Sequence, residues 1–261
     1  MATRAARSLR HEYGLYIEQE IENYKESIPR AAILAIGDEA AARLASESQF
    51  VLTELLLLEE VDRIIFKRLR LPMYDTWRRK RMKLHDEMRR PEHWGLHADD
   101  AVVRTIAAAH ASSSHVLLAG GAERSALFLA ANGCEVTTIG DEYEAVERVM
   151  RAALQAGLGE RVHALTDELT QYHPSSPLHA VVCSHPTLDA LAPADRARVI
   201  EVLQSATRDG GVHLVETIVA GSAAIEELRS RYAGWTISIE ADRSDTQVFF
   251  ARKDRERAVS H

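Results

Sequence analysis

The stretch from Ser114 to Asp141 restricts the fold more than any other part of the sequence. A short apolar run, Val116 to Ala119, has the length of a buried strand and ends in the pair Gly120-Gly121. A helical pattern starts at once, Asn132-Gly133 breaks it, and a second β-rich run ends beside Asp141. We therefore expect strand, tight turn, helix and strand, the βαβ unit of a nucleotide-binding domain.

The chemistry of this stretch favours the same interpretation. Glycines after a buried strand let a ligand approach the main chain closely, because they carry no side chain. The helix that follows offers free N–H groups at its positive end. Asp141, placed after the second strand, is an acceptor for the hydroxyl groups of a ribose.

Strands and helices continue to alternate after this unit. We expect helices over 142–154, 193–207 and 222–231, strands over 162–165, 179–183, 212–218, 235–241 and 247–251, an exit loop at 184–187 and a turn at 209–211. The last two strands lie too close in sequence for a helical crossover. The fold class is therefore α/β and Rossmann-like, with a mostly parallel seven-stranded sheet that ends in a C-terminal antiparallel hairpin.

An all-α domain precedes this sheet. Apolar residues at helical spacing predict helices over 3–28, over 38–45 after a break at Ile36-Gly37-Asp38, over 46–69 and over 74–90. Leu55 to Leu58 cover more than a full turn, which predicts a helix buried on all sides, either in the core of the chain or in a dimer interface. We expect a helical domain over 1–97, acting as a lid, a substrate wall or a dimerisation element, and the α/β domain over 98–261.

The segment from Arg63 to Arg90 is strongly basic, with eleven Lys or Arg residues against three acidic ones. It either meets an anionic substrate or acidic partner, or forms a solvated face whose charges pair within the fold. Trp94 follows it, and this ring either flanks a purine at the mouth of the α/β domain or packs at the domain junction. His93 and His97 have no third ligand nearby, so no metal site is expected.

Composition restricts the class of protein further. The chain has 261 residues and a formal net charge of −7, which argues against a general nucleic-acid binder. Its two cysteines, Cys134 and Cys183, form no disulfide framework, so a reducing, cytoplasmic location is expected. No apolar run approaches the length of a membrane span, and we expect no membrane partner.

Residues 98–252 resemble the class I S-adenosylmethionine-dependent methyltransferases, including small-molecule enzymes of the tellurite-resistance type. Four motifs carry the resemblance, in the order of that family: Val116 to Ala130, Gly133 to Thr137, Asp209-Gly210-Gly211 and Tyr232-Ala233-Gly234-Trp235. The resemblance implies S-adenosylmethionine as cofactor and methyl transfer as reaction. Residues 1–97 match no family pattern.

The resemblance also implies a set of site residues. The turn after the first strand is expected to contact the methionine part of the cofactor, the acid after the second strand its ribose, and the acids after the third strand its adenine. The cofactor-binding residues are then Ala119, Gly120, Gly121, Glu123, Asp141, Glu142, Asp167, Glu168 and Ser184. His185 is expected to line the methyl-transfer pocket and to act as the base when the nucleophile carries a proton.

The sequence departs from the family pattern at three places. Leu117 and Leu118 stand where the first strand normally ends in an acid, Glu123 follows the glycine pair, and Gly140 precedes the ribose acid. We expect Glu123 to take over from the missing acid and to pair with the ammonium group of the cofactor. Two functions remain: methyl transfer to a small or medium-sized metabolite, or an inactive methyltransferase fold that serves as a binding or assembly module, with homodimerisation through the N-terminal helices.

Overall fold

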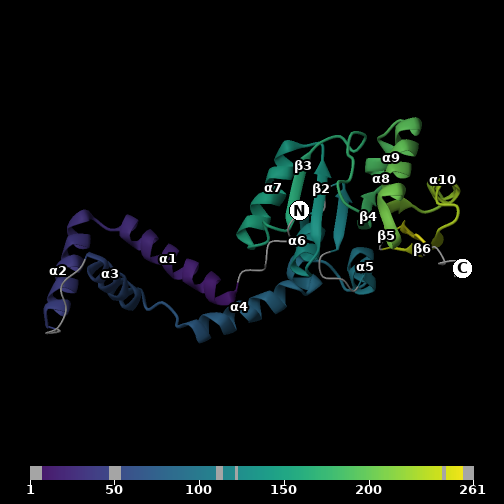
Figure 1. Ribbon diagram of the computed structural model, residues 1–261. Helices are drawn as coiled ribbons and strands as arrows, with labels where there is room; N and C mark the ends of the chain where they lie inside the picture. Colours follow the sequence, from purple (N-terminus) through teal and green to yellow (C-terminus); the bar gives the residue numbers. More distant parts are fainter. Residues whose placement is uncertain (1–7, 47–53, 110–113, 121–122, 243–244, 255–261) are drawn as a thin grey trace, which may run out of the picture. The chain divides into compact units, whose positions relative to one another are not determined.

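The computed structural model describes residues 8–46, 54–109, 114–120, 123–242 and 245–254. The chain forms two compact units, Met1–Leu84 and His85–His261 (Figure 1). No described helix is long and apolar enough to cross a membrane.

The first unit is helical, as the sequence predicts. It contains α1 (Leu9–Ser27), α2 (Arg30–Ser46), α3 (Glu54–Leu69) and most of α4 (Tyr74–Met88). Ser8 caps α1 by accepting a hydrogen bond from the N–H of His11. The core of this unit consists of buried aliphatic side chains from the first three helices: Ile21, Ile36, Ala40, Val61, Ile64 and Ile65.

One expectation for these helices is wrong, and for α3 one of the two alternatives is ruled out, which leaves the dimer interface as a prediction. The break at Ile36-Gly37-Asp38 is absent, and α2 runs through it, because Ile36 and Ala40 on one face of that helix are fully buried in the core. Packing of that face offsets the cost of about 1 kcal/mol for a glycine inside a helix. Leu55 and Leu58 are 67% and 52% exposed, so α3 is not buried on all sides within the chain.

The second unit is built on one seven-stranded sheet in the order β3-β2-β1-β4-β5-β7-β6. Its strands are β1 (His115–Ala119), β2 (Glu135–Gly140), β3 (Val162–Thr166), β4 (Leu178–Ser184), β5 (Thr207–Val219), β6 (Thr236–Ala241) and β7 (Thr246–Arg252). The first five pair in parallel, and β7 pairs antiparallel with both β5 and β6. The predicted fold class, including the C-terminal hairpin, is confirmed.

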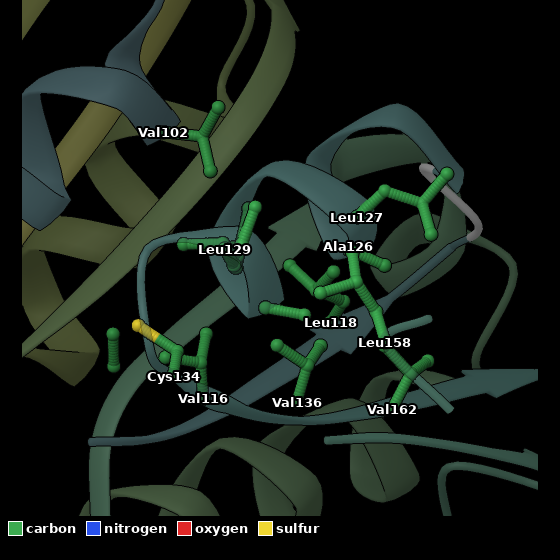
Figure 2. Packing of buried hydrophobic residues seen from close by; sticks show 14 of the residues in the cluster. Val102, Val116, Leu118, Ala126, Leu127, Leu129, Cys134, Val136, Leu158 and Val162 are labelled. Carbon is green, nitrogen blue, oxygen red and sulfur yellow. The ribbon is translucent and has the colours of Figure 1, made fainter. Parts of the chain in front are cut away.

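Helices cover both faces of this sheet, and alternate residues of the strands face two separate cores. Val116 and Leu118 pack with α5 (Ala101–Ala109), α6 (Glu123–Ala131) and α7 (Tyr143–Gln155) in the first core (Figure 2). Leu117 and Ala119 pack with α9 (Pro193–Ala206) and α10 (Ala224–Arg231) in the second. The run from 116 to 119 is apolar throughout because a strand covered on both faces has no side that meets water.

Two loops expected from the sequence are regular structure instead. The exit loop at 184–187 is the start of a short helix, α8 (His185–Asp189), which Ser184 caps. The turn at 209–211 lies within β5. A capping serine followed by Pro186 in the first turn is a helix start signal that accounts for the first difference.

Trp94 ends a short 3-10 helix, η1 (Pro91–Trp94), in the second unit. Its ring packs against the first core, and its indole N–H donates to the carbonyl oxygen of Met88 at 2.6 Å. This placement favours the packing role for Trp94 over the role of a purine-flanking ring.

Candidate functional site

The sheet order reverses between β1 and β4, and this reversal locates the candidate site. β1 leads outward to β2 and β3 on one side, while β4 leads to β5 on the other. In open α/β sheets, ligands bind outside the carboxyl ends of the strands at such a switch point. Ala119 is in register with Ile139 and with Cys183, so the turns after β1, β2 and β4 begin at the same edge.

Gly120 leaves β1 with a φ of +92°, a conformation that glycine adopts without strain. A Cβ added there would lie 2.1 Å from Thr187 Oγ1 and 2.5 Å from Ser184 Oγ. These two hydroxyl groups hydrogen-bond each other at 2.7 Å. The glycine therefore lets α8 and the end of β4 pack against the bare main chain of this turn. Gly121, the second glycine of the expected motif, lies outside the described residues.

Glu123 is the first residue of α6, as expected for an acid at a positive helix end. Its carboxylate lies 3.5 Å from the guanidinium of Arg148 on α7. This ion pair gives Glu123 a partner within the protein, which the sequence did not indicate.

Asp141 and Glu142 directly follow β2, and both are exposed. Glu142 occupies the N-cap position of α7 without a side-chain capping bond. Neither carboxylate forms an ion pair with a described residue, so both are accessible to a ligand at this edge.

Asp167 and Glu168 follow β3, in the loop next to the end of β2. Asp167 Oδ1 accepts a hydrogen bond from the N–H of Glu168 at 2.8 Å, and Glu168 Oε2 accepts one from Thr170 Oγ1 at 3.2 Å. Both residues are exposed. The structure therefore brings the acids after β2 and β3 to neighbouring strand ends.

His185 is the first residue of α8 and is half-buried. It follows Ser184, whose hydroxyl oxygen accepts a hydrogen bond from the N–H of Thr187 at 3.3 Å. The imidazole makes no hydrogen bond to a described residue. The residue lies at the switch point, at the end of β4.

Glu216 is a residue of this edge that sequence reasoning missed. It lies on β5 in register with Ser184, and its side chain is half-buried. Burial, followed by the negative charges of Asp242 and Asp100, raises the pKa of Glu216 to about 7. A carboxyl group with such a pKa exchanges protons readily near neutral pH.

The backbone next to Glu216 is irregular. Thr217 has a φ of +60°, and the pairing of β5 with β7 shifts register between Val215 and Ile218. Bulges of this kind re-aim a side chain and recur next to active sites. In the sequence, Glu216 stands out only as a single acid inside the apolar strand 212–218. Hydrophobic periodicity alone does not identify such an acid as functional.

A cavity of about 140 Å³ lies elsewhere, on the face of the sheet that α9 covers. Residues 169–173 of the loop after β3 form one wall, and Arg198, Val199, Val202 and Leu203 of α9 form the other. None of the site residues expected from the sequence lines it.

The strand order, the parallel core, the antiparallel β7 and the flanking helices define the class I methyltransferase fold. Among solved structures, the CcbJ methyltransferase from Streptomyces caelestis matches with a TM-score of 0.50 and 14% identity, over 58% of this chain and 88% of that one. An rRNA methylase from Streptococcus thermophilus matches with a TM-score of 0.49 and 14% identity, over 64% and 98% of the two chains. TehB from Haemophilus influenzae matches with a TM-score of 0.48 and 17% identity, over 61% and 63%. No family model and no curated protein matches the sequence.

Proposed function

We propose that the second unit is an S-adenosylmethionine-dependent methyltransferase that acts on a small or medium-sized metabolite. The observation that carries this proposal is the convergence of a glycine turn, Ser184, His185 and Glu216 at the switch point of a class I methyltransferase fold. The sheet order supports ligand placement at that edge, because open α/β sheets bind ligands at the switch point.

The residues at this edge fit the cofactor. Asp141 and Glu142 are exposed acceptors for ribose hydroxyls. The N-terminus of α6 and the hydroxyls of Ser184 and Thr187 are suited to the carboxylate of the methionine part. S-adenosylmethionine, when bound, supplies a methyl group on a positively charged sulfur, so the protein has to hold a nucleophile in line with it.

Two groups are placed to take a proton from such a nucleophile. His185 has an imidazole nitrogen available, and Glu216 has a carboxylate whose pKa is near neutrality. We assign His185 or Glu216 as the base for an acceptor that carries a proton. Cys183 stands two residues before His185 and is buried, and burial raises the pKa of its thiol to about 12, so it stays protonated and inert.

The second candidate function is a binding or assembly module without catalysis. Three observations favour it: the hydroxyls of Ser184 and Thr187 fill the space beside Gly120, Glu123 is paired with Arg148, and leucines on α2 and α3 are exposed.

For either function we propose a homodimer formed through the first unit, with Leu34, Leu55 and Leu58 at its contact. The buried free thiols of Cys134 and Cys183 support a cytoplasmic location.

Calorimetric titration with S-adenosylhomocysteine separates these two functions. Saturable binding, together with a rise in melting temperature at ligand concentrations well above Kd, supports the methyltransferase. An absence of heat and of any thermal shift at millimolar ligand contradicts it and favours the assembly module.

A further inference from the structure

Three polar side chains at the amino end of the strands form a hydrogen-bonded chain that the proposed function does not use. His115 is the first residue of β1, and Glu135 is the first residue of β2. His115 Nε2 lies 2.7 Å from Glu135 Oε2. The other ring nitrogen, His115 Nδ1, lies 2.9 Å from Ser176 Oγ in the loop before β4. Serine, histidine and carboxylate follow one another here as they do in a catalytic triad.

The carboxylate of Glu135 determines the roles of the two ring nitrogens. An ionised carboxylate only accepts hydrogen bonds, so His115 Nε2 carries a proton and donates it. In the neutral ring Nδ1 is then an acceptor, and the hydroxyl of Ser176 donates to it. An imidazole in this position can remove the hydroxyl proton when the oxygen attacks. The two ring nitrogens are exchanged relative to the chymotrypsin triad, but each group keeps its role.

The fold holds these three groups in place. His115 and Glu135 are a register pair of adjacent parallel strands, so their side chains lie on the same face of the sheet. The main-chain N–H of His115 also donates to His179 Nδ1 on β4 at 3.1 Å. Ser176 directly precedes Pro177, which restricts its backbone to extended conformations. Two strands and a restricted loop residue therefore preorganise the contact between hydroxyl and imidazole.

The three groups are accessible to a small molecule. The side chains of His115 and Glu135 are 37% and 43% exposed, and Ser176 is half-buried. Arg208, the second residue of β5, is exposed. Burial, followed by the positive charge of Arg208 and by His115, lowers the pKa of His179. A guanidinium whose field reaches this end of the sheet favours negative charge that develops on a substrate there.

We propose that Ser176, His115 and Glu135 hydrolyse small carboxylic esters, with Ser176 as the nucleophile. Ser176 Oγ attacks the carbonyl carbon while His115 Nδ1 takes the hydroxyl proton. The bond from that carbon to the leaving oxygen breaks, the leaving alkoxide takes the proton, and Ser176 carries the acyl group. Water repeats the sequence, which releases the carboxylic acid and restores the serine. An ester suits this site better than an amide, because an alkoxide leaves more readily than an amine anion and a half-exposed site strengthens electrostatic interactions little.

This activity is separate from the proposed methyl transfer. His115 and Glu135 begin their strands, whereas the candidate cofactor site lies at the carboxyl ends of the same strands. At about 3.3 Å per residue, Ala119 at the other end of β1 lies about 13 Å from His115. The full chain without cofactor is therefore the protein to test.

The first measurement is labelling with a fluorophosphonate, which forms a covalent bond to an activated serine oxygen. Mass spectrometry of the digested protein locates the label, and we expect it on Ser176. Labelling should reduce the hydrolysis of p-nitrophenyl acetate to the level of Ser176→Ala. The matched control is Ser175→Ala, at the exposed neighbouring serine, which should be labelled on Ser176 at the wild-type rate.

Two further variants test the partners of the serine. His115→Gln should slow labelling about 100-fold, because the general base is lost. Glu135→Gln should slow it at least about tenfold, because an amide can donate to His115 Nε2 and so favour the wrong tautomer. The wild-type labelling rate should rise with pH as His115 loses its proton, and this step should be missing from His115→Gln. The melting temperature of each variant checks that the fold is kept.

Three results would overturn the proposal. One is no label on Ser176 under conditions that label an established serine hydrolase. Another is equal labelling of Ser175 and Ser176, which would show general reactivity of exposed serines. The last is a wild-type labelling rate in both His115→Gln and Glu135→Gln, which would leave the three groups as a structural contact between strands and loop.

Discussion

Ser184 at the end of β4 lies in register with Glu216 on β5. The first caps α8 and lies beside the glycine turn after β1, and the second is a half-buried carboxyl group whose pKa is raised to about 7. Two neighbouring strands thus place a hydroxyl group and a protonatable carboxyl group at the edge where this fold binds ligands.

Glu216 makes stability dependent on pH. Because its folded pKa of about 7 lies above the ordinary value of 4.5, the folded protein binds the proton more tightly than the unfolded chain. Its contribution to the free energy of unfolding is complete below about pH 4.5. It decreases as the pH rises through 7, by about 3 kcal/mol at most. Glu216→Gln should therefore gain stability relative to the wild type as the pH rises, as measured by urea unfolding at pH 5 and 8. The control is Glu201→Gln on the exposed side of α9, and an equal pH dependence in the wild type and Glu216→Gln would refute the assignment.

Gly120→Ala should destabilise the second unit, because the new Cβ meets Thr187 and Ser184 and the φ of +92° is strained for alanine. We expect a loss of about 2–4 kcal/mol in the free energy of unfolding. Gly234→Ala is a matched control, since Gly234 has a φ of +88° and nothing within 4 Å of its added Cβ. The control should cost only about 1 kcal/mol. Adding Thr187→Ala to Gly120→Ala should recover part of the difference, and no recovery would show that the contact with Thr187 is unimportant.

His213 should make the protein sensitive to acid. It is buried between the hydroxyls of Thr207 and Tyr232, each 2.7 Å from a ring nitrogen, and burial lowers its pKa to about 3. The unfolded chain therefore binds more protons between pH 6.5 and 3, and stability decreases as the pH falls through this range. His213→Gln should be less stable than the wild type at pH 7 but lose less on acidification to pH 5, by about 2 kcal/mol. Parallel melting-temperature profiles of the two proteins would contradict this.

Asp141→Asn should weaken the binding of S-adenosylhomocysteine, because an exposed carboxylate after β2 is the expected acceptor for the ribose hydroxyls. Loss of hydrogen bonds to a charged acceptor should raise Kd about tenfold or more in calorimetry. Asp209→Asn, an exposed acid on β5, should leave Kd unchanged. If both variants bind equally well, another residue holds the ribose.

Leu55→Glu/Leu58→Glu should convert the proposed dimer into a monomer. Both leucines are exposed on α3, and carboxylates cannot be desolvated in an apolar contact without a large cost. Sedimentation velocity of the wild type and the variant measures the change. Glu54→Gln/Glu59→Gln, exposed on the same helix, should leave the association state unchanged. A wild-type protein that sediments as a monomer at high concentration would contradict the dimer.

Much of the second unit could be predicted because its signals are local. The apolar run 116–119, the Asn132-Gly133 break and the short link between the last two strands each depend on a few neighbouring residues. The error in the first unit arose where packing outweighed a local signal: Gly37 was expected to break a helix, but burial of Ile36 and Ala40 keeps α2 continuous. The expected exit loop at 184–187 became α8 because Ser184 caps it and Pro186 suits its first turn.

The sequence by itself determined the α/β class, the mostly parallel sheet and the acids that follow the second and third strands, because hydrophobic period and turn chemistry are read over short windows. The tertiary structure alone decided that Ser184 and Thr187 fill the space beside Gly120, that Arg148 pairs with Glu123, and that Glu216 lies beside Ser184 with a raised pKa. Each of these relations joins residues from different strands or helices, and burial and charge proximity exist only once the chain has brought them together.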